Sequence, residues 1–227
     1  ERVGMRVGRY AYGWSAGVER TGQAVGSEPV GGAGRMVVAA GDKGQLVRQR
    51  IGEVANRLFY EQGFVRTSFS DIALAADMPR GNFYYHFRSK DEILQAVIDK
   101  RLDDIAAMLA QWDSTLPVPL DRLKRFVRMV LNEAPDVKRF GCPMGSLNQE
   151  LIKLDDGRQA EAKRLFDMFD AWLRKQFELC GKPPADAARL AMHLQGRMQG
   201  IALLGAAYND AEYIEREVQL LLRWLED

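Results

Sequence analysis

Two short helical patterns that meet at a tight break, within residues 66–92, constrain the fold of this chain more than any other feature. The first pattern places four apolar residues at helical spacing on one face: Phe69, Ile72, Ala73 and Ala76. Asp77 can make the turn because Asp tolerates the left-handed backbone conformation better than most residues. Pro79 then suits the first position of a second helix, where no N–H is needed. The pattern predicts a helix-turn-helix.

The second helix of this motif has an apolar side and a polar side. Phe83 and Phe87 are four residues apart and should face the core. Gly81 is costly inside a helix, and close approach to a DNA backbone is one reason to keep it. Four further side chains are left to face outward: Arg80, Asn82, Tyr84 and Tyr85. We therefore expect this helix to enter the major groove of DNA.

The same region resembles the TetR family of bacterial transcription regulators. The resemblance rests on Gly63-Phe64, Thr67, Asp71-Ile72-Ala73, the run 81–87 and Ser89-Lys90. The family usually has Gly-Val in the turn, where this chain has Asp77-Met78. The resemblance implies an all-α fold, with an N-terminal three-helix helix-turn-helix domain at 43–90. A larger helical effector-binding and dimerisation domain would follow at 91–227.

The family pattern also implies which residues lie at the DNA surface: Thr67, Ser68, Arg80, Gly81, Asn82, Tyr84, Tyr85, His86 and Lys90. Lys90 and His86 should touch phosphates, and Arg80 and Asn82 can reach base edges. Residues 43–90 contain eight Lys or Arg and four acidic residues, a local charge of +4 in a chain whose net charge is +1. A basic head of this kind is expected where a protein contacts phosphates, although a solvated helix face would give the same composition.

The first 42 residues show no helical or strand period. Eleven of the 21 glycines lie within residues 1–44. We expect residues 1–42 to be a disordered or non-native extension, with Met36 resembling a natural start. A basic arm that reaches a minor groove is the alternative.

The remaining helices can be placed from periodicity and punctuation. We expect Ser68 to cap the first helix of the motif, and Ser89 and Glu92 to form a capping box for the third. The expected helices are 43–61, 89–112, 120–132, 145–154, 158–180, 185–208 and 211–226, with a broken stretch at 135–145.

The last two expected helices indicate a homodimer. The first combines small residues with leucines, and the second is apolar at Ile214, Val218, Leu221 and Leu222. Packing each pair against its symmetry mate would give a four-helix interface, as the resemblance implies. An intramolecular core is the alternative, because the pattern does not say what it packs against.

The middle of the chain should hold a pocket for a small organic effector. Bulky and adaptable side chains there can line it: Trp112, Phe126, Met129, Phe140, Met144, Phe166, Phe169 and Trp172. His193 and Arg197 are four apart on an apolar helix and could face a ligand, or form a satisfied interface pair.

Cys142 lies in a segment, 140–147, that resembles one found in several TetR subfamilies, including electrophile-sensing repressors. A cysteine near a helix N-terminus can have a lowered pKa and be a better nucleophile. The alternative is a small buried thiol between two glycines. Cys180 is expected to be structural.

These features favour a ligand-responsive regulator, most simply a repressor that binds palindromic double-stranded operator DNA as a homodimer. The alternative within this class is a thiol-based repressor acting through Cys142. An enzyme is disfavoured because no phosphate loop and no triad or metal spacing is visible, and no cofactor is expected. Two widely spaced cysteines, no membrane-spanning apolar run and no signal peptide point to the cytoplasm. A helical adaptor would not need the outward residues of 80–90.

Overall fold

The computed structural model describes residues 40–227, and the expected extension before Ala40 lies outside them. This part of the chain forms ten α-helices: α1 (Ala40–Glu61), α2 (Phe69–Ala75), α3 (Arg80–His86), α4 (Lys90–Thr115), α5 (Pro119–Asn132), α6 (Ala134–Phe140), α7 (Pro143–Leu154), α8 (Arg158–Leu179), α9 (Pro184–Ala207) and α10 (Ala211–Trp224). No strand occurs between residues 40 and 227, which confirms the all-α prediction over that range.

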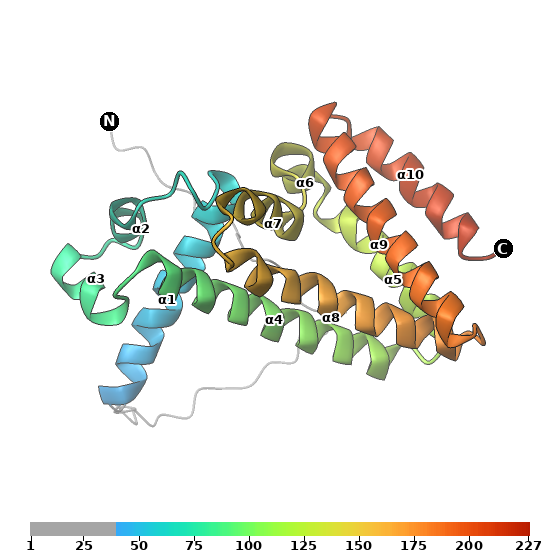
Figure 1. Ribbon diagram of the computed structural model, residues 1–227, viewed down its shortest axis with the longest axis horizontal. Coiled ribbons are helices and arrows are strands. Elements are labelled where there is room, and N and C mark those ends of the chain that lie inside the picture. The colour runs from blue at the N-terminus through green and yellow to red at the C-terminus, as the bar shows by residue number, and fades with distance from the viewer. Residues whose placement is uncertain (1–39) are drawn as a thin grey trace, which may run out of the picture.

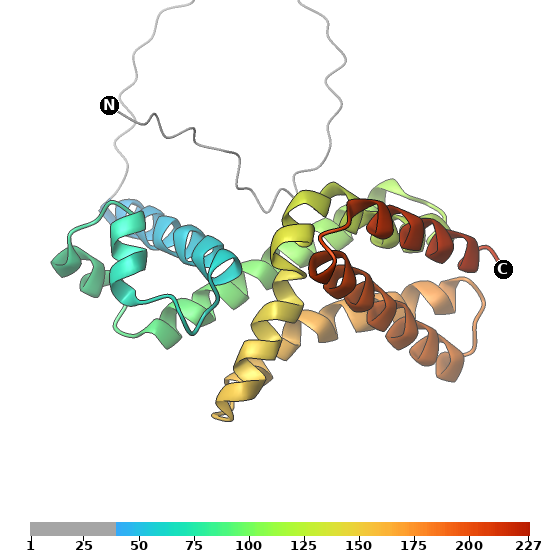
Figure 2. The same cartoon turned by 90° about the horizontal axis from the view of Figure 1, so that it is seen from above.

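The helices divide into a small head and a larger helical body (Figure 1). Helices α1 to α3 form the head, and α4 leads from it to run beside α8. Helices α9 and α10 lie at the opposite end of the molecule, where α10 packs on α5 and α9 (Figure 2). Helices α6 and α7 lie between the head and that far end, and α7 packs against both α1 and α8.

The turn between α2 and α3 forms as the residues predict. Ser68 caps α2, because its hydroxyl accepts from the backbone N–H of Asp71 and the Asp71 carboxylate accepts from that of Ser68. Asp77 adopts the left-handed conformation, with φ of 51°. Pro79 lies at the N-cap of α3, one position before the predicted one. Phe83 and Phe87 are fully buried, as expected.

Three sequence-based expectations about the helices are wrong. Residues 134–140 form helix α6 within the stretch expected to be broken, because Pro135 sits in its first turn, where no N–H is needed. Helix α1 begins at Ala40, before the expected Lys43. Ser89 does cap α4, but Glu92 accepts from the backbone of Arg88, so the reciprocal bond of a capping box is missing.

The core runs continuously through both parts of the molecule. Buried side chains of α1, α2 and α3 meet Ile93, Leu94 and Val97 at the start of α4. Further along α4, Trp112 joins the core of the body. No helix among residues 40–227 is long and apolar enough to cross a membrane.

Candidate nucleic-acid interface and adjoining cavity

The outer face of α3 presents the side chains that the sequence assigned to it. Asn82 is exposed, and Tyr84 and Tyr85 are exposed by 56% and 84%. The Tyr84 ring stacks on Phe69 of α2 at 5.4 Å, which orients it while leaving its edge in solvent. The side chain of Arg80 lies outside the described part of the structure. The described side chains leave α3 free to approach a large flat or grooved partner.

Gly81 lies on the same outer face, and neither packing within the fold nor the local backbone conformation requires a glycine there. A Cβ atom there would meet no atom within 4 Å, and the backbone φ is not positive. Glycine destabilises a helix interior by roughly 0.5–1 kcal/mol relative to alanine. A glycine that costs stability and relieves no internal contact is consistent with close approach of an external partner.

Two of the predicted surface residues precede α2, and one of them is misassigned. Ser68 is exposed, with its hydroxyl engaged in the α2 cap. Thr67 is fully buried, and its hydroxyl donates to the Gly63 carbonyl at 2.7 Å. The sequence pattern could not separate these neighbours, because both are small hydroxyl residues at the start of a helix. The Thr67 side chain cannot contact DNA in this arrangement.

Lys90 and His86 are half-buried at the ends of their helices. The Lys90 ammonium lies 4.2 Å from the centre of the Phe64 ring and donates to the Val65 carbonyl at 3.4 Å. Burial, followed by the nearby Arg158, lowers the pKa of Lys90. The Lys90 ammonium is therefore held at the rim of the head. An ammonium has three N–H donors, so it retains donors for an external anion.

A cavity lies in the body between α5, α6, α7, α8 and α9. Its empty space, including the open mouth, measures about 540 Å³. Fourteen residues line it: Phe126, Met129, Val130, Glu133, Val137, Cys142, Pro143, Met144, Phe166, Phe169, Gln195, Met198, Gln199 and Ala202. The wall is mostly apolar, with a few polar groups, as is usual for small-molecule sites.

The lining of this cavity includes some of the residues predicted for an effector pocket and leaves out others. Five residues assigned to the effector site do line the cavity: Phe126, Met129, Cys142, Met144 and Phe169. Phe166, noted beside them, does so too. All come from elements whose apolar faces converge, so their assignment needed only helical periodicity and side-chain size.

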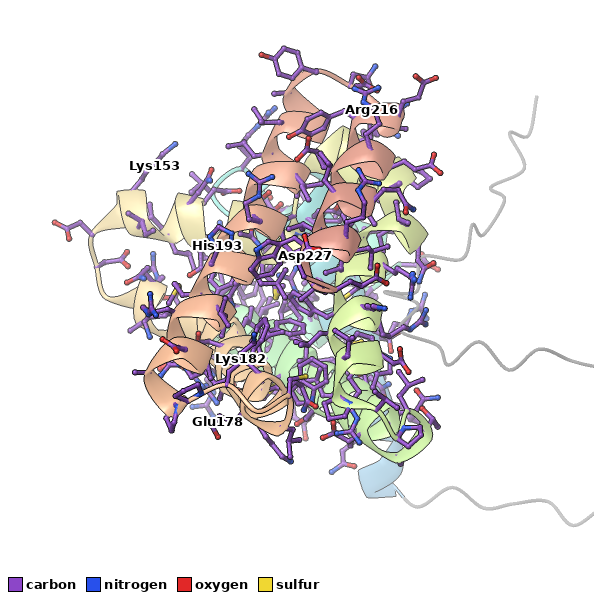
Figure 3. The ribbon with its side chains drawn as sticks, turned by 90° about the vertical axis from the view of Figure 1, so that its right-hand side faces the viewer. Lys153, Glu178, Lys182, His193, Arg216 and Asp227 are labelled. Atoms are coloured by element: carbon purple, nitrogen blue, oxygen red, sulfur yellow. The ribbon has the colours of Figure 1, made fainter. Side chains whose placement is uncertain are left out.

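Five other residues assigned to the pocket lie elsewhere. Trp112 and Trp172 pack against each other at 5.8 Å, and Trp172 donates to Asp113. Phe140 packs on Tyr60 of α1. His193 and Arg197 are exposed on α9 and do not line the cavity; Figure 3 labels His193 at this end of the molecule.

These two polar residues of α9 have partners of their own. Arg197 pairs with Glu217 of α10 at 3.1 Å, and His193 lies 5.2 Å from the Trp224 ring. The alternative that treated them as satisfied residues rather than ligand contacts fits these positions. Helical spacing put them on one face, but only the packing of α9 against α10 shows which side faces out.

Glu133 is the lining residue with the most unusual electrostatics, and the sequence analysis missed it. It lies between α5 and α6, and burial, followed by the nearby Asp136, raises its pKa to about 7. No hydrogen bond contributes to this shift. A lone acid after Asn132 carries no sequence signal, because most such residues are solvated.

Cys142 occupies the predicted helix N-terminus, but its chemistry differs from the expectation. It is the N-cap of α7, and its sulfur accepts from the Gly145 backbone at 3.4 Å. Burial nevertheless raises the pKa of the thiol, and that effect exceeds those of its hydrogen bonds. The expectation of a lowered pKa is therefore wrong. The exposed Cys180 also has a raised pKa, from partial burial.

The junction of α6 and α7, residues 141–143, contacts both the cavity and the head; it is called the α6–α7 segment below. Pro143 lines the cavity, and its carbonyl accepts from the Arg101 guanidinium of α4 at 3.1 Å. The same guanidinium donates to Asn56 of α1 at 2.7 Å. Tyr60 of α1 donates to the Gly141 carbonyl at 2.8 Å. A movement of this segment would therefore change its hydrogen-bond contacts with α1.

A second connection lies at the other end of α7. The Glu150 carboxylate accepts from the backbone N–H of Val65, just before α2, at 3.0 Å. Gly63 has a φ of 91°, and a Cβ there would lie 2.6 Å from Glu150. The chain between α1 and α2 thus packs closely on α7, and Gly63 is required for that approach.

Most of the head and the start of α4 are similar to known regulatory proteins. Residues 51–97 match the family model described as bacterial regulatory proteins, tetR family. The repressor DhaR of Mycobacterium sp. (strain GP1) is 31% identical over 136 residues, which cover 59% of this chain and 65% of that protein. The regulator TtgR of Pseudomonas putida is 34% identical over 100 residues, 43% of this chain and 47% of that protein. The matches thus span less than two thirds of either relative.

Solved structures extend the likeness to the body. A TetR transcriptional regulator from Legionella pneumophila has a TM-score of 0.69 at 26% identity, and the match covers 76% of this chain and 94% of that one. A TetR regulatory protein from Rhodobacter sphaeroides has a TM-score of 0.67 at 26% identity, over 78% and 98% of the two chains. Both parts of the molecule therefore have the arrangement found in these regulators.

Proposed function

Because the chain belongs to the TetR family of bacterial transcriptional regulators, we propose that it is a ligand-responsive repressor that binds a palindromic operator as a homodimer. The observation that carries the DNA assignment is the outer face of α3. Asn82 supplies an amide that can pair with adenine, and Tyr84 and Tyr85 are exposed beside it. As a regulator that binds DNA, the protein would act in the cytoplasm.

The proposed division of labour follows the two parts of the molecule. Residues 43–90 would read DNA, and residues 91–227 would bind effector and form the dimer. The α6–α7 segment supports a link between them, because it lines the cavity and bonds to α1 and α4. An effector that binds the DNA-incompetent arrangement more tightly would then release the operator, by no more than that difference in affinity.

The proposed dimer face lies on α9 and α10, which Figure 3 views. Large apolar side chains remain exposed on these helices and just after α9: Met192 (57%), Leu203 (57%), Leu204 (40%), Tyr208 (74%) and Leu220 (46%). A second copy of the chain is the proposed occupant, since two α3 helices must reach successive major grooves on one face of the duplex. Apolar residues at such a position are expected in an interface.

The residues that the sequence had assigned to this interface belong instead to the protomer core. Leu221 and Leu222 are exposed by only 3% and 7% within one chain, and Ile214 and Val218 are fully buried. Glu at either leucine would therefore unfold the protomer rather than test the dimer. The intramolecular alternative is right for these positions.

The dimer is tested at residues that one chain leaves exposed. We expect the double variant Leu203→Glu/Leu220→Glu to fold, with an unchanged helical circular dichroism spectrum, and to sediment as a monomer that binds operator weakly. Val118→Glu is the control, because Val118 is also exposed (48%) but lies between α4 and α5. A double variant that stays dimeric would place the interface elsewhere.

The operator is tested by selecting bound duplexes from a random pool with the full chain. We expect a palindromic consensus with half-sites about one helical turn, or a multiple of it, apart.

Gly81→Ala should stabilise the protein by roughly 0.5–1 kcal/mol and weaken operator binding, because a methyl group would stand between α3 and DNA. No enriched sequence, or full operator affinity in Gly81→Ala, would argue against the proposed docking.

A further inference from the structure

The cavity contains one acidic group and no basic one. Among its fourteen lining residues there is no lysine, arginine or histidine. Glu133 is therefore the single lining residue that carries a full charge when it ionises near neutral pH. The other polar side chains are the amides of Gln195 and Gln199 and the Cys142 thiol.

Both amides are already engaged. Gln195 donates to the Phe166 carbonyl of α8 at 3.0 Å. Gln199 lies over Gly145, where a Cβ would come within 2.5 Å of its oxygen, and it also bonds the Cys142 thiol. These groups hold the wall together. Glu133 differs, because no hydrogen bond or ion pair within residues 44–227 stabilises its carboxylate.

The surroundings of Glu133 disfavour the charged form of its carboxyl group. Among the residues that the structure describes, the charge that acts on Glu133 is that of Asp136, which is also negative. Glu133 is partly buried, and partial burial of a carboxylate without a partner opposes its ionisation. A cation brought next to it would relieve that penalty. An anionic ligand would instead meet like charge in a cavity with no basic side chain.

The rest of the wall suits a cation that carries apolar groups. Phe126, Phe166 and Phe169 place three aromatic rings in the lining, and aromatic faces attract ammonium groups. Met129, Met144 and Met198 add flexible, polarisable side chains that adapt to ligand shape. A hydrophilic metal ion finds no cluster of three or more His, Cys, Asp or Glu among the described residues.

We infer that this cavity selects a compact organic cation, an ammonium compound with apolar substituents whose positive charge lies against the Glu133 carboxylate and whose body contacts the phenylalanine and methionine wall. The inference rests on the proposed function, because it names the chemical class of the effector. It does not depend on the operator sequence or on the dimer.

The test compares three probes of similar size with the full-length protein at pH 8, by calorimetric titration. Phenyltrimethylammonium carries the charge, tert-butylbenzene has the same shape without it, and benzoate carries the opposite charge. We expect the cation to bind about tenfold more tightly than tert-butylbenzene or better, and benzoate to bind most weakly. The cation should also release the selected operator DNA.

Glu133→Gln keeps the shape of the side chain and removes its charge. We expect this variant to lose about tenfold or more in affinity for the cation while its affinity for tert-butylbenzene stays within about twofold. Asp136→Asn is the matched control. Asp136 is an exposed acid near Glu133 that does not line the cavity, so cation affinity should change by less than about threefold.

The pH dependence provides an independent reading. The titratable groups in the lining are Glu133 and Cys142, with Asp136 near the first. Because the ionised carboxylate binds the cation, affinity should rise from pH 6 to pH 8 in the wild type and in Asp136→Asn, and stay flat in Glu133→Gln. Cys142→Ser should keep the wild-type rise.

Four results would overturn the inference: no cation binding at millimolar concentration, equal binding of cation and neutral isostere, preferred binding of benzoate, or a cation preference that survives in Glu133→Gln. Each can occur with a protein that binds its operator normally, in which case the repressor proposal stands with another effector. Failure to select any DNA sequence would instead refute the repressor proposal, whatever the cavity binds.

Discussion

The surface of α3 and the cavity of the body place their polar groups in opposite surroundings. On α3, Asn82 and Tyr85 stand in solvent, and the apolar residues Phe83 and Phe87 are hidden beneath them. In the cavity, a wall of apolar side chains surrounds one acid, Glu133. The first arrangement costs little free energy in the unbound protein, because the polar groups are solvated, and it leaves them available to a large charged partner. The second carries an electrostatic penalty that a small ligand can remove.

The largest expected effect is on the free energy of unfolding, and it comes from the cost of ionising the Glu133 carboxyl in the cavity. A folded-state pKa of about 7, against an ordinary 4.5, means that the native state holds a proton that the unfolded state releases between those values. Stability should therefore fall as pH rises from about 4.5 to 7, by an upper bound of roughly 3 kcal/mol, which water at the cavity mouth reduces.

Urea unfolding at pH 5 and pH 8 measures this contribution. We expect Glu133→Gln to be more stable than wild type at pH 8 and to lose the part of the pH slope that the carboxyl supplies. Asp136→Asn should keep most of that slope. Parallel slopes in wild type and Glu133→Gln would show that the carboxylate is well solvated and would remove the contrast with α3.

A smaller effect is expected at Asn82, where the exposed surface meets DNA. Replacing its amide with the methyl group of alanine should cost roughly 1–3 kcal/mol of binding free energy on the selected operator and relax the base preference at one position.

Lys90→Ala should instead weaken binding to all duplexes and flatten the salt dependence of the binding constant by about one unit of slope. Fluorescence anisotropy on operator and random duplexes separates the two. Equal losses on both duplexes for Asn82→Ala would refute the base contact.

Thr67 sharpens the comparison because it lies in the head yet behaves as an interior residue. Thr67→Val removes the bond from its hydroxyl to the Gly63 carbonyl, and should lower the free energy of unfolding by about 1 kcal/mol. Operator affinity of the folded protein should be unchanged at low temperature. A loss of operator affinity with unchanged stability would instead indicate that Thr67 contacts DNA.

The smallest effect is expected at Cys142. Its raised pKa leaves little thiolate at neutral pH, so iodoacetamide should modify the exposed Cys180 faster than Cys142, without releasing DNA. Mass spectrometry of the modified peptides, followed by anisotropy on operator DNA, measures both. Rapid alkylation of Cys142 with release of the operator, abolished in Cys142→Ser, would favour the thiol-sensing alternative over reversible ligand binding.

The residues predicted well from sequence are those whose environment is set by near neighbours. Ser68 caps α2, Asp77 makes the turn, and Phe83 and Phe87 are buried, because each depends on hydrogen bonds or spacing within a few positions. Thr67 and Glu92 were misassigned for the complementary reason. The fate of a short polar side chain depends on which backbone group it meets, and several lie within reach.

The sequence by itself determined most of the helices, the helix-turn-helix and the side of α3 that faces out, since 3.6-residue periodicity and caps are local properties. Only the tertiary structure decided which apolar faces meet. It buried Leu221 and Leu222 inside the protomer, turned His193 and Arg197 outward, and placed the partly buried Glu133 in a mostly apolar wall. Those outcomes depend on packing between helices far apart in the chain, and periodicity along one helix carries no information about its partner.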